Sequence, residues 1–376
     1  MQIEHLEILI IEPDGEKSNY LRSAFSEAGY PSHICVSGEE GIKYLETEAS
    51  PIVFLSDRLP GLSGIEVLNI IESIQPMTQV IYMLGEENLR ELMLSIAGRI
   101  PNFLFPPLTP ELVHLAAKKA EQNYRIEKDK WLNLESLRRD LKIASRIQKQ
   151  LLTVDSGETD GIFYGGFIRP SGFLTGDFCK ITCAAPNIDL ILGDISGTGI
   201  TSAILAQEVI RLAERQTGSL PGTLMAGLNN AIVDRLGSCS LGIISVQANC
   251  RDRTFSYCGG GIPVPVQIRK DGSYQFLPIS NQAIGILRNL ELKTGMGKIE
   301  PGDMIFVFTD GLLELGMGQQ GAMDEIFSQI FQNIGQTKSL TDFQNAFQKT
   351  VHSFENSRLK KGFADDVAMA LIYFPG

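Results

Sequence analysis

The sequence lacks the features that mark membrane, secreted and nucleic-acid-binding proteins. No apolar run among its 376 residues reaches the roughly 18 residues of a membrane span, and the first residues lack the basic start of a signal peptide. Its six cysteines show no C-x-x-C spacing, which indicates neither a zinc cage nor a disulfide framework. With 33 basic and 44 acidic residues, the net charge of −11 disfavours broad binding to nucleic acid or to an anionic membrane. We therefore expect a cytoplasmic protein with reduced thiols.

Length and composition indicate a multidomain chain. Glycine and proline, at 37 and 17 residues, are close to average usage, which excludes collagen-like structure and general disorder. At about 150 residues per domain, the length predicts two or three compact units. We expect an α/β doubly wound domain over residues 1–120, a linker helix over 121–152, and an α+β domain over 153–376. The last should contain an antiparallel β-sandwich with flanking helices.

Residues 6–118 alternate short apolar runs with amphipathic stretches, which is typical of βαβ units around a parallel sheet. Runs without a polar face fit strands that helices cover on both sides. Glu12 and Asp57 stand just past two expected strand ends, where α/β folds place their sites. The expected strands are Ile8–Ile11, Ile52–Leu55, Val80–Leu84 and Phe103–Phe105, and the expected helices include Tyr20–Ala28 and Ile65–Ile74.

A long helix should join the two domains, because no glycine or proline occurs between His114 and Leu152. Ten Lys or Arg against five Asp or Glu give this segment a local charge of +5. Two interpretations of this helix stay open. It is either a solvated linker or a parallel coiled coil that makes the protein a homodimer. The length of the helix and its apolar seam favour the coiled coil. The apolar seam consists of Leu134, Leu137, Leu141, Ala144, Ile147 and Leu151.

The region from Gly161 to Gly376 is rich in strand-like runs punctuated by glycine. The expected strands are Asp189–Leu192, Leu241–Ala248, Thr254–Tyr257, Val264–Arg269, Met304–Phe308 and Val367–Tyr373. The expected helices are Thr201–Thr217, Thr223–Leu236, Asp324–Ile334 and Leu340–Phe354.

Acidic residues of this region stand at strand ends or in tight glycine turns. An isolated Asp-Gly is usually a turn, so the site interpretation rests on the group as a whole. Unpaired carboxylates beside apolar sequence are costly, and no matching Arg or Lys occurs at these turns. A hard divalent cation, Mg²⁺ or Mn²⁺, fits such oxygens, and two ions together would activate water against a phosphoryl group. The acidic residues are Asp177, Asp194, Asp310, Asp365 and Asp366.

The order of these motifs resembles the metal-dependent protein phosphatases (the protein phosphatase 2C-like family), and most closely their stage II sporulation protein E branch. The resemblance covers residues from about 140 to 376. The stretch 144–152 also resembles the helix that commonly leads into this domain. The motifs are Leu174–Phe178, Leu190–Ile200, Pro301–Asp303, Phe308–Glu314 and Asp365–Val367.

The resemblance implies a two-metal site that hydrolyses phosphoserine or phosphothreonine in a partner protein, often an anti-sigma-factor antagonist. Asp194 would bridge two Mn²⁺ or Mg²⁺ ions, and the Ile195 carbonyl would add a ligand. Asp194 and Asp310 would be essential for catalysis. Two positions depart from the branch, since Thr198 and Gly261 replace histidines that are common there. The other implied ligands are Asp177, Asp310 and Asp365, with Asp366 as the alternative to its neighbour.

The N-terminal part resembles the receiver domains of two-component response regulators. Asp57 lies where that family has its phospho-acceptor, and Glu12 is one of the two acids that precede it. Pro13 replaces the second acid, Leu84 the hydroxyl residue and Phe105 the lysine. Two carboxylates without that lysine would repel each other. We expect a degenerate receiver that binds a regulator rather than accepting phosphate.

Three other interpretations fit parts of the sequence. A non-enzymatic adaptor with a phosphatase fold would account for Thr198 and Gly261, although the acidic positions are retained. A nucleotide-binding loop at residues 193–199 lacks the lysine and the third glycine of the known fingerprints. A Ser-His-Asp hydrolase has neither a G-x-S-x-G elbow nor a histidine at the glycine turns.

Overall fold

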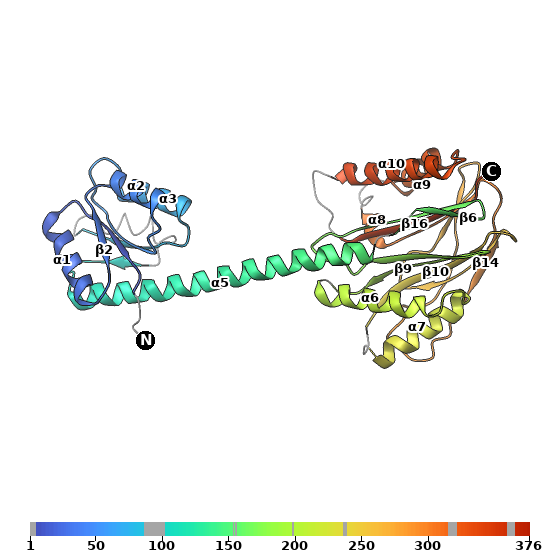
Figure 1. The fold of residues 1–376 in the computed structure, drawn as a ribbon, viewed down its shortest axis with the longest axis horizontal. Coiled ribbons are helices and arrows are strands. Elements are labelled where there is room, and N and C mark those ends of the chain that lie inside the picture. Colours follow the sequence, from blue (N-terminus) through green and yellow to red (C-terminus); the bar gives the residue numbers. More distant parts are fainter. Residues whose placement is uncertain are drawn as a thin grey trace. The chain divides into compact units, whose positions relative to one another are not determined.

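The computed structural model describes residues 5–85, 102–152, 154, 156–197, 199–235, 239–314, 322–358 and 365–376. The chain forms two compact units, Met1–Arg138 and Arg139–Gly376, both drawn in Figure 1. Their boundary falls inside one helix, and the expected domain limits at residues 120 and 152 stay predictions. None of the helices in these described ranges is both long enough and apolar enough to cross a membrane.

The first unit is built on a five-stranded parallel sheet. Its strands are β1 (Ile8–Ile11), β2 (Ser32–Cys35), β3 (Ile52–Ser56), β4 (Gln79–Met83) and β5 (Phe103–Leu104). Its helices are α1 (Gly15–Glu27), α2 (Gly38–Thr47), α3 (Gly64–Ile74) and the start of α5 (Pro110–Leu151). The strand order β2-β1-β3-β4-β5 is that of flavodoxin-like doubly wound folds. The predicted α/β class is therefore confirmed.

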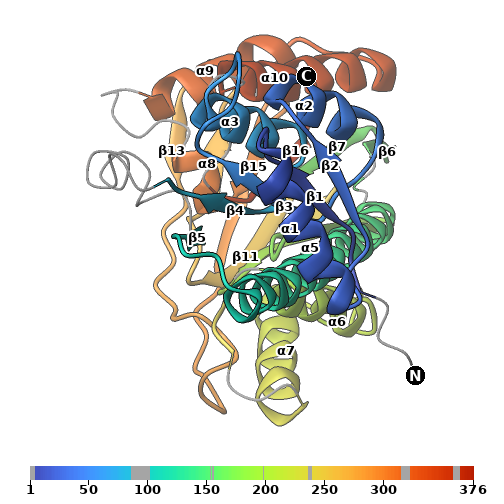
Figure 2. The same cartoon turned by 90° about the vertical axis from the view of Figure 1, so that its left-hand side faces the viewer.

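Helices cover both faces of this sheet, as Figure 2 shows. Ile8 and Ile10 pack with α1 and the first turns of α5, whereas Leu9 and Ile11 pack with α2 and α3. All four side chains are fully buried, which explains why β1 has no polar face. The helices begin at side-chain caps where the sequence supplies them: Asp14 accepts from two backbone N–H groups of α1.

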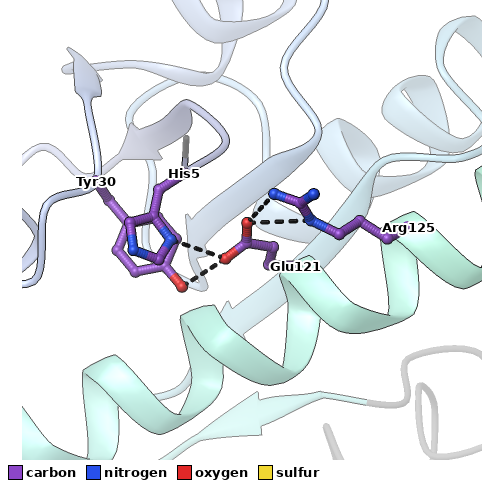
Figure 3. Close-up of polar contacts among 4 residues, drawn as sticks. All are labelled: His5, Tyr30, Glu121 and Arg125. Atoms are coloured by element: carbon purple, nitrogen blue, oxygen red, sulfur yellow. Dashed lines mark hydrogen bonds and ion pairs between the residues drawn. The ribbon is translucent and has the colours of Figure 1, made fainter. Parts of the chain in front are cut away.

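A buried carboxylate ties α5 to the first unit. Glu121 accepts hydrogen bonds from the hydroxyl of Tyr30 at 2.8 Å, from Nδ1 of His5 at 3.1 Å and from Nη2 of Arg125 at 2.6 Å (Figure 3). Burial alone would raise the pKa of Glu121, but these hydrogen bonds outweigh it and lower that pKa. The carboxylate is therefore stable as an anion, and it fixes the first half of α5 against the sheet.

The helix α5 is 42 residues long and confirms the predicted continuous helix. Val113 and Ala117 are fully buried in the first unit, and Gln148 and Leu152 are buried in the second. Between these ends the helix exposes large apolar side chains to about half of their area. These side chains include Trp131, Leu132, Leu134, Leu137, Ile143 and Ile147.

The second unit contains two antiparallel sheets. The five-stranded sheet has the order β14-β11-β10-β9-β8, and the six-stranded sheet has the order β13-β12-β15-β16-β7-β6. The first consists of β8 (Phe178–Ala184), β9 (Asn187–Ile195), β10 (Leu241–Asn249), β11 (Thr254–Gly260) and β14 (Gly295–Lys298). The second consists of β6 (Gly157–Thr159), β7 (Ile162–Arg169), β12 (Val266–Ile268), β13 (Tyr274–Phe276), β15 (Met304–Phe308) and β16 (Val367–Tyr373).

The two sheets pack face to face with helices outside, which agrees with the expected sandwich. Leu192 and Ile244 of one sheet share a core with Val307 of the other. The outer face of the five-stranded sheet is covered by α6 (Ile200–Glu214) and α7 (Pro221–Arg235). The outer face of the six-stranded sheet is covered by α9 (Ala322–Ile334) and α10 (Leu340–Arg358) (Figure 1). The short helix α8 (Asp310–Glu314) follows β15 directly.

Candidate metal centre

Strand pairing brings Asp177 next to Asp194. Phe178, the first residue of β8, pairs with Gly193 of β9 in antiparallel register. Asp177 precedes that pair and Asp194 follows it, so both carboxylates lie at the same end of the five-stranded sheet. Asp177 is only 2% exposed, and Asp194 is partly buried.

The other acidic residues come from the adjoining end of the six-stranded sheet. Asp310 is the first residue of α8, and Asp365 and Asp366 directly precede β16. A β-carbon on Gly311 would lie 1.9 Å from the carbonyl oxygen of Asp366. Only glycine allows this close approach, so the Asp-Gly pair here is required for packing two segments together.

A hydrogen bond joins the two sheets at this point. Oγ1 of Thr309, which directly follows β15, donates to Oδ2 of Asp177 at 2.7 Å. The same oxygen accepts from the backbone N–H of Ala368 in β16 at 2.9 Å. Thr309 is fully buried, so its hydroxyl orients the Asp177 carboxylate inside the protein.

The surroundings of Asp177 and Asp194 make both carboxyl groups costly to ionise. Burial, followed by the charges of Asp194, Asp366 and Asp365, raises the pKa of Asp177 well above its usual value, although the Thr309 hydroxyl opposes the rise. Burial and the charge of Asp310 raise the pKa of Asp194 to about 6, against a hydrogen bond shared with Asp177. Such shifts indicate a group of acids that lacks a compensating positive charge.

The side chains of this centre carry carboxylate oxygens, which are the ligands that hard divalent cations prefer. Within the described ranges, no three His, Cys, Asp or Glu side chains converge closely enough to hold a metal ion by themselves. Asp177 and Asp194 are in contact. Asp310 and Asp365 are exposed; the charge of Asp365 acts on both of the contacting acids, and that of Asp310 acts on Asp194. An open all-oxygen set suits Mg²⁺ or Mn²⁺, which retain several waters in their coordination shell.

The remaining predicted positions surround this centre. Ile195 ends β9, and its carbonyl oxygen lies 3.0 Å from where a β-carbon on Gly176 would stand. Thr198 lies outside the described residues. Gly261 has a φ of +68°, and a β-carbon there would meet that of Ala283 at 2.6 Å. A histidine at residue 261 would therefore strain this backbone.

Sequence reasoning missed a contact between α5 and the centre. The side-chain amide of Gln148 donates to the Thr175 carbonyl at 2.8 Å and accepts from the Thr175 N–H at 3.1 Å. Oγ1 of Thr175 in turn accepts from the N–H of Asp177 at 2.9 Å. In the sequence, Gln148 stands out only as a polar residue beside the apolar seam, and that pattern predicts no partner for its side chain.

The structure contradicts two of the rival interpretations. β9, which precedes the glycine-rich loop and α6, pairs antiparallel with both β8 and β10, so no dinucleotide-binding βαβ unit is formed. A Ser-His-Asp site is also wrong, because the histidines have other surroundings. Their contacts are His5 with Glu121, His33 with Tyr44, His114 with the Ala24 carbonyl and His352 with the Gln348 carbonyl.

The receiver-like residues also lie together. Glu12 and Asp57 follow the neighbouring strands β1 and β3 and line one cavity of about 860 Å³, together with Lys17 and Arg58. Oδ2 of Asp57 accepts from the Gly85 N–H at 2.9 Å. The buried side chain that follows β4 is Leu84, an apolar residue.

The sequence profile described as "Stage II sporulation protein E (SpoIIE)" matches residues 185–375. The chain belongs to the SpoIIE family. It is 23% identical to the "Phosphoserine phosphatase RsbU" of Bacillus subtilis over 235 residues, which cover 60% of this chain and 70% of RsbU. It is also 22% identical to the "Transcriptional regulatory protein GlrR" of Escherichia coli over 61% of this chain, and spans just over half of GlrR, 56%.

The SpoIIE-family unit shares its fold with a solved phosphatase domain. The SiaA-PP2C domain of Pseudomonas aeruginosa matches 64% of this chain and 98% of its own length, with a TM-score of 0.51 and 18% identity. The likeness confirms the expected protein phosphatase 2C-like fold for the β-sandwich and its flanking helices.

Proposed function

We propose that this chain is a metal-dependent phosphatase that removes phosphate from serine or threonine of a partner protein. The observation that carries the proposal is the contact between the Asp177 and Asp194 carboxylates, whose pKa values are both raised. Buried acids this close together, at the meeting point of two sheets, are costly to ionise unless a cation binds them. Membership of the SpoIIE family supports the choice of a phosphatase.

Several residues would hold the metal ions at this centre. Asp194 lies centrally and would contact both of two Mn²⁺ or Mg²⁺ ions, with the Ile195 carbonyl as a further oxygen ligand. Asp177, Asp310 and Asp365 would complete the set. When bound, such ions activate a water for attack on phosphorus and offset the negative charge of the phosphoryl group. Since no protein nucleophile is needed, the chain's part is to hold these oxygens in place.

The substrate we propose is a phosphoserine or phosphothreonine protein of a bacterial-type signalling pathway. The similarity to RsbU, which is named a phosphoserine phosphatase, supports this class. An anti-sigma-factor antagonist is the substrate that the family resemblance suggests. The receiver-like unit would then bind a regulatory protein rather than carry a phosphoryl group.

Regulation would pass through α5. Gln148 lies on this helix and holds Thr175, two residues before Asp177, so a small shift of the helix changes the metal centre. The apolar side chains exposed on α5, such as Leu134 and Leu137, favour association with a second copy of the chain. We therefore propose a homodimer formed through α5 as a coiled coil.

The test is Mn²⁺-dependent hydrolysis of a phosphoserine peptide by the full chain. Asp194→Asn and Asp310→Asn should each abolish turnover, whereas Asp271→Asn, an exposed acid in the same unit, should leave it unchanged. An unmodified chain that is inert with Mn²⁺, and also inert after removal of the receiver-like unit, would overturn the catalytic proposal.

A second candidate is a non-enzymatic adaptor that uses the phosphatase fold to bind a partner. The positive φ of Gly261, where the family commonly has a histidine, favours it. The two candidates differ in metal binding, because an ion bound by the native state raises thermal stability. An unchanged melting temperature in Mn²⁺ would favour the adaptor.

A further inference from the structure

One carboxylate holds both ends of the loop that carries Asp177. Oδ1 of Asp366 accepts from the backbone N–H of Ser171 at 2.7 Å and from its hydroxyl at 2.8 Å. Oδ2 accepts from the backbone N–H of Gly176 at 3.1 Å. Ser171 and Gly176 lie at the two ends of the β7–β8 loop, so both oxygens of one side chain are used to close it.

The neighbouring acid is engaged differently. Asp365 is exposed, and its Oδ1 accepts from the N–H of Asp366 at 2.8 Å. Asp366 is partly buried and accepts three hydrogen bonds, which fix the direction of its carboxylate. Asp365 and Asp366 thus differ in their surroundings although both are aspartates, and of the two only the Asp365 side chain is exposed.

Asp366 is itself held firmly. Its carbonyl oxygen lies so close to Gly311 that no side chain fits between them. Two residues further on, the N–H of Ala368 binds the Thr309 hydroxyl, which also holds Asp177. The residue that anchors the loop and the residue that holds the Asp177 carboxylate therefore lie at the paired ends of β16 and β15.

We infer that Asp366 is a positioning residue, not a metal ligand: it closes the β7–β8 loop so that Asp177 faces Asp194 before any metal binds. The inference rests on the proposed function for its consequence in catalysis. Its physical reason is geometric, because one carboxylate accepts from the N–H groups of Ser171 and Gly176 at the two ends of the loop. The three hydrogen bonds that Asp366 accepts restrain the loop as far as Gly176, the residue next to Asp177.

Hydrogen exchange on the metal-free full chain tests the clamp independently of activity. Asp366→Ala should speed exchange of the Ser171 and Gly176 amides at least tenfold, whereas Asp365→Asn should leave both unchanged. Asp271→Ala is the matched control, because Asp271 accepts from the N–H and hydroxyl of Ser273 in the same pattern, away from the centre. Unchanged exchange in Asp366→Ala would overturn the inference.

Calorimetry with Mn²⁺ separates positioning from ligation. Asp366→Asn retains an oxygen that accepts from Ser171, so it should bind Mn²⁺ within a few-fold of the unmodified chain and with the same number of ions. Asp365→Asn should lose affinity by tenfold or more. Loss of one bound ion in Asp366→Asn would make Asp366 a ligand. If the unmodified chain binds no Mn²⁺, the proposed function fails, and the exchange result still decides the clamp.

Discussion

Thr309 and Asp177 belong to segments that border different sheets, and Oγ1 of Thr309 donates to Oδ2 of Asp177 across 2.7 Å. Thr309→Val removes this donor and leaves the N–H of Ala368 without its hydroxyl acceptor. A hydrogen bond to a charged group contributes about 1.5–3 kcal/mol. We expect Mn²⁺ affinity to fall about tenfold or more at pH 7, measured by calorimetry. Thr309→Ser keeps the hydroxyl and should bind normally; equal binding by the valine variant would contradict the role.

Asp194 should make the metal-free protein less stable as pH rises. Its pKa is raised from 3.8 to about 6 in the folded chain, so the folded state binds more protons than the unfolded state between these values. Its contribution to stability is therefore greatest below pH 4 and is lost as pH rises through about 6. Urea denaturation in a chelator should show this slope, and Asp194→Asn should flatten it. An identical slope in the variant would refute the assignment.

Gln148 should affect turnover although it lies outside the metal centre. Gln148→Leu keeps the size of the side chain but leaves the buried N–H and carbonyl of Thr175 unpaired, which disturbs the segment before Asp177. We expect kcat to fall about tenfold and the Mn²⁺ requirement to rise by a similar factor. Gln150→Leu, an exposed position on the same helix, is the control. If Gln148→Leu and Gln150→Leu have the same kinetics, the proposal that α5 regulates the centre is wrong.

Asp57 should resist phosphorylation. Leu84 and Phe105 offer neither a hydroxyl nor an ammonium group to a phosphoryl group at this site, and Oδ2 of Asp57 already accepts from the Gly85 N–H. Incubation with acetyl phosphate and Mg²⁺, followed by intact mass measurement, should give no added phosphate. Stoichiometric labelling that disappears in Asp57→Asn would show a working receiver.

Leu137 should contribute to self-association. It is 50% exposed on α5, in line with the other apolar side chains of the predicted seam. Leu137→Glu places a charge in that seam, so we expect sedimentation velocity to show monomers where the unmodified chain gives dimers. Lys142→Glu, an exposed charge reversal on the same helix, should leave the dimer intact. A chain that sediments as a monomer before any substitution would contradict the coiled coil.

Apolar runs predicted the strands that are buried on both faces. Val367–Tyr373 was expected from its composition and forms β16 with every side chain buried. β2 was not expected, because Ser32–Cys35 lies at a sheet edge and only Cys35 is fully buried, so it needs no apolar run. β8 was also not expected, since Phe178–Ala184 mixes apolar residues with Lys180 and Thr182.

The acids of the centre could be predicted because each stands beside glycine or at a strand end. The residues that hold these acids in place could not be predicted. Thr309 binds Asp177 across 132 positions and Asp366 binds Ser171 across 195, and no local pattern marks such pairs. Gln148 is equally ordinary in the sequence, where it sits beside an apolar seam. These side chains acquire a role only when the two sheets meet.

The order of strands has a consequence for how the protein is made. β7 lies between β6 and β16 in the six-stranded sheet, and Arg169 pairs with Val367 across almost two hundred residues. Pairing over such a separation is slow to form, and β7 must wait during synthesis until β16 has been added. A chain cut before Val367 would still carry Asp177, Asp194 and Asp310, yet it would have no strand to close the sheet. We therefore expect the acidic centre to form only after β16 has been synthesised.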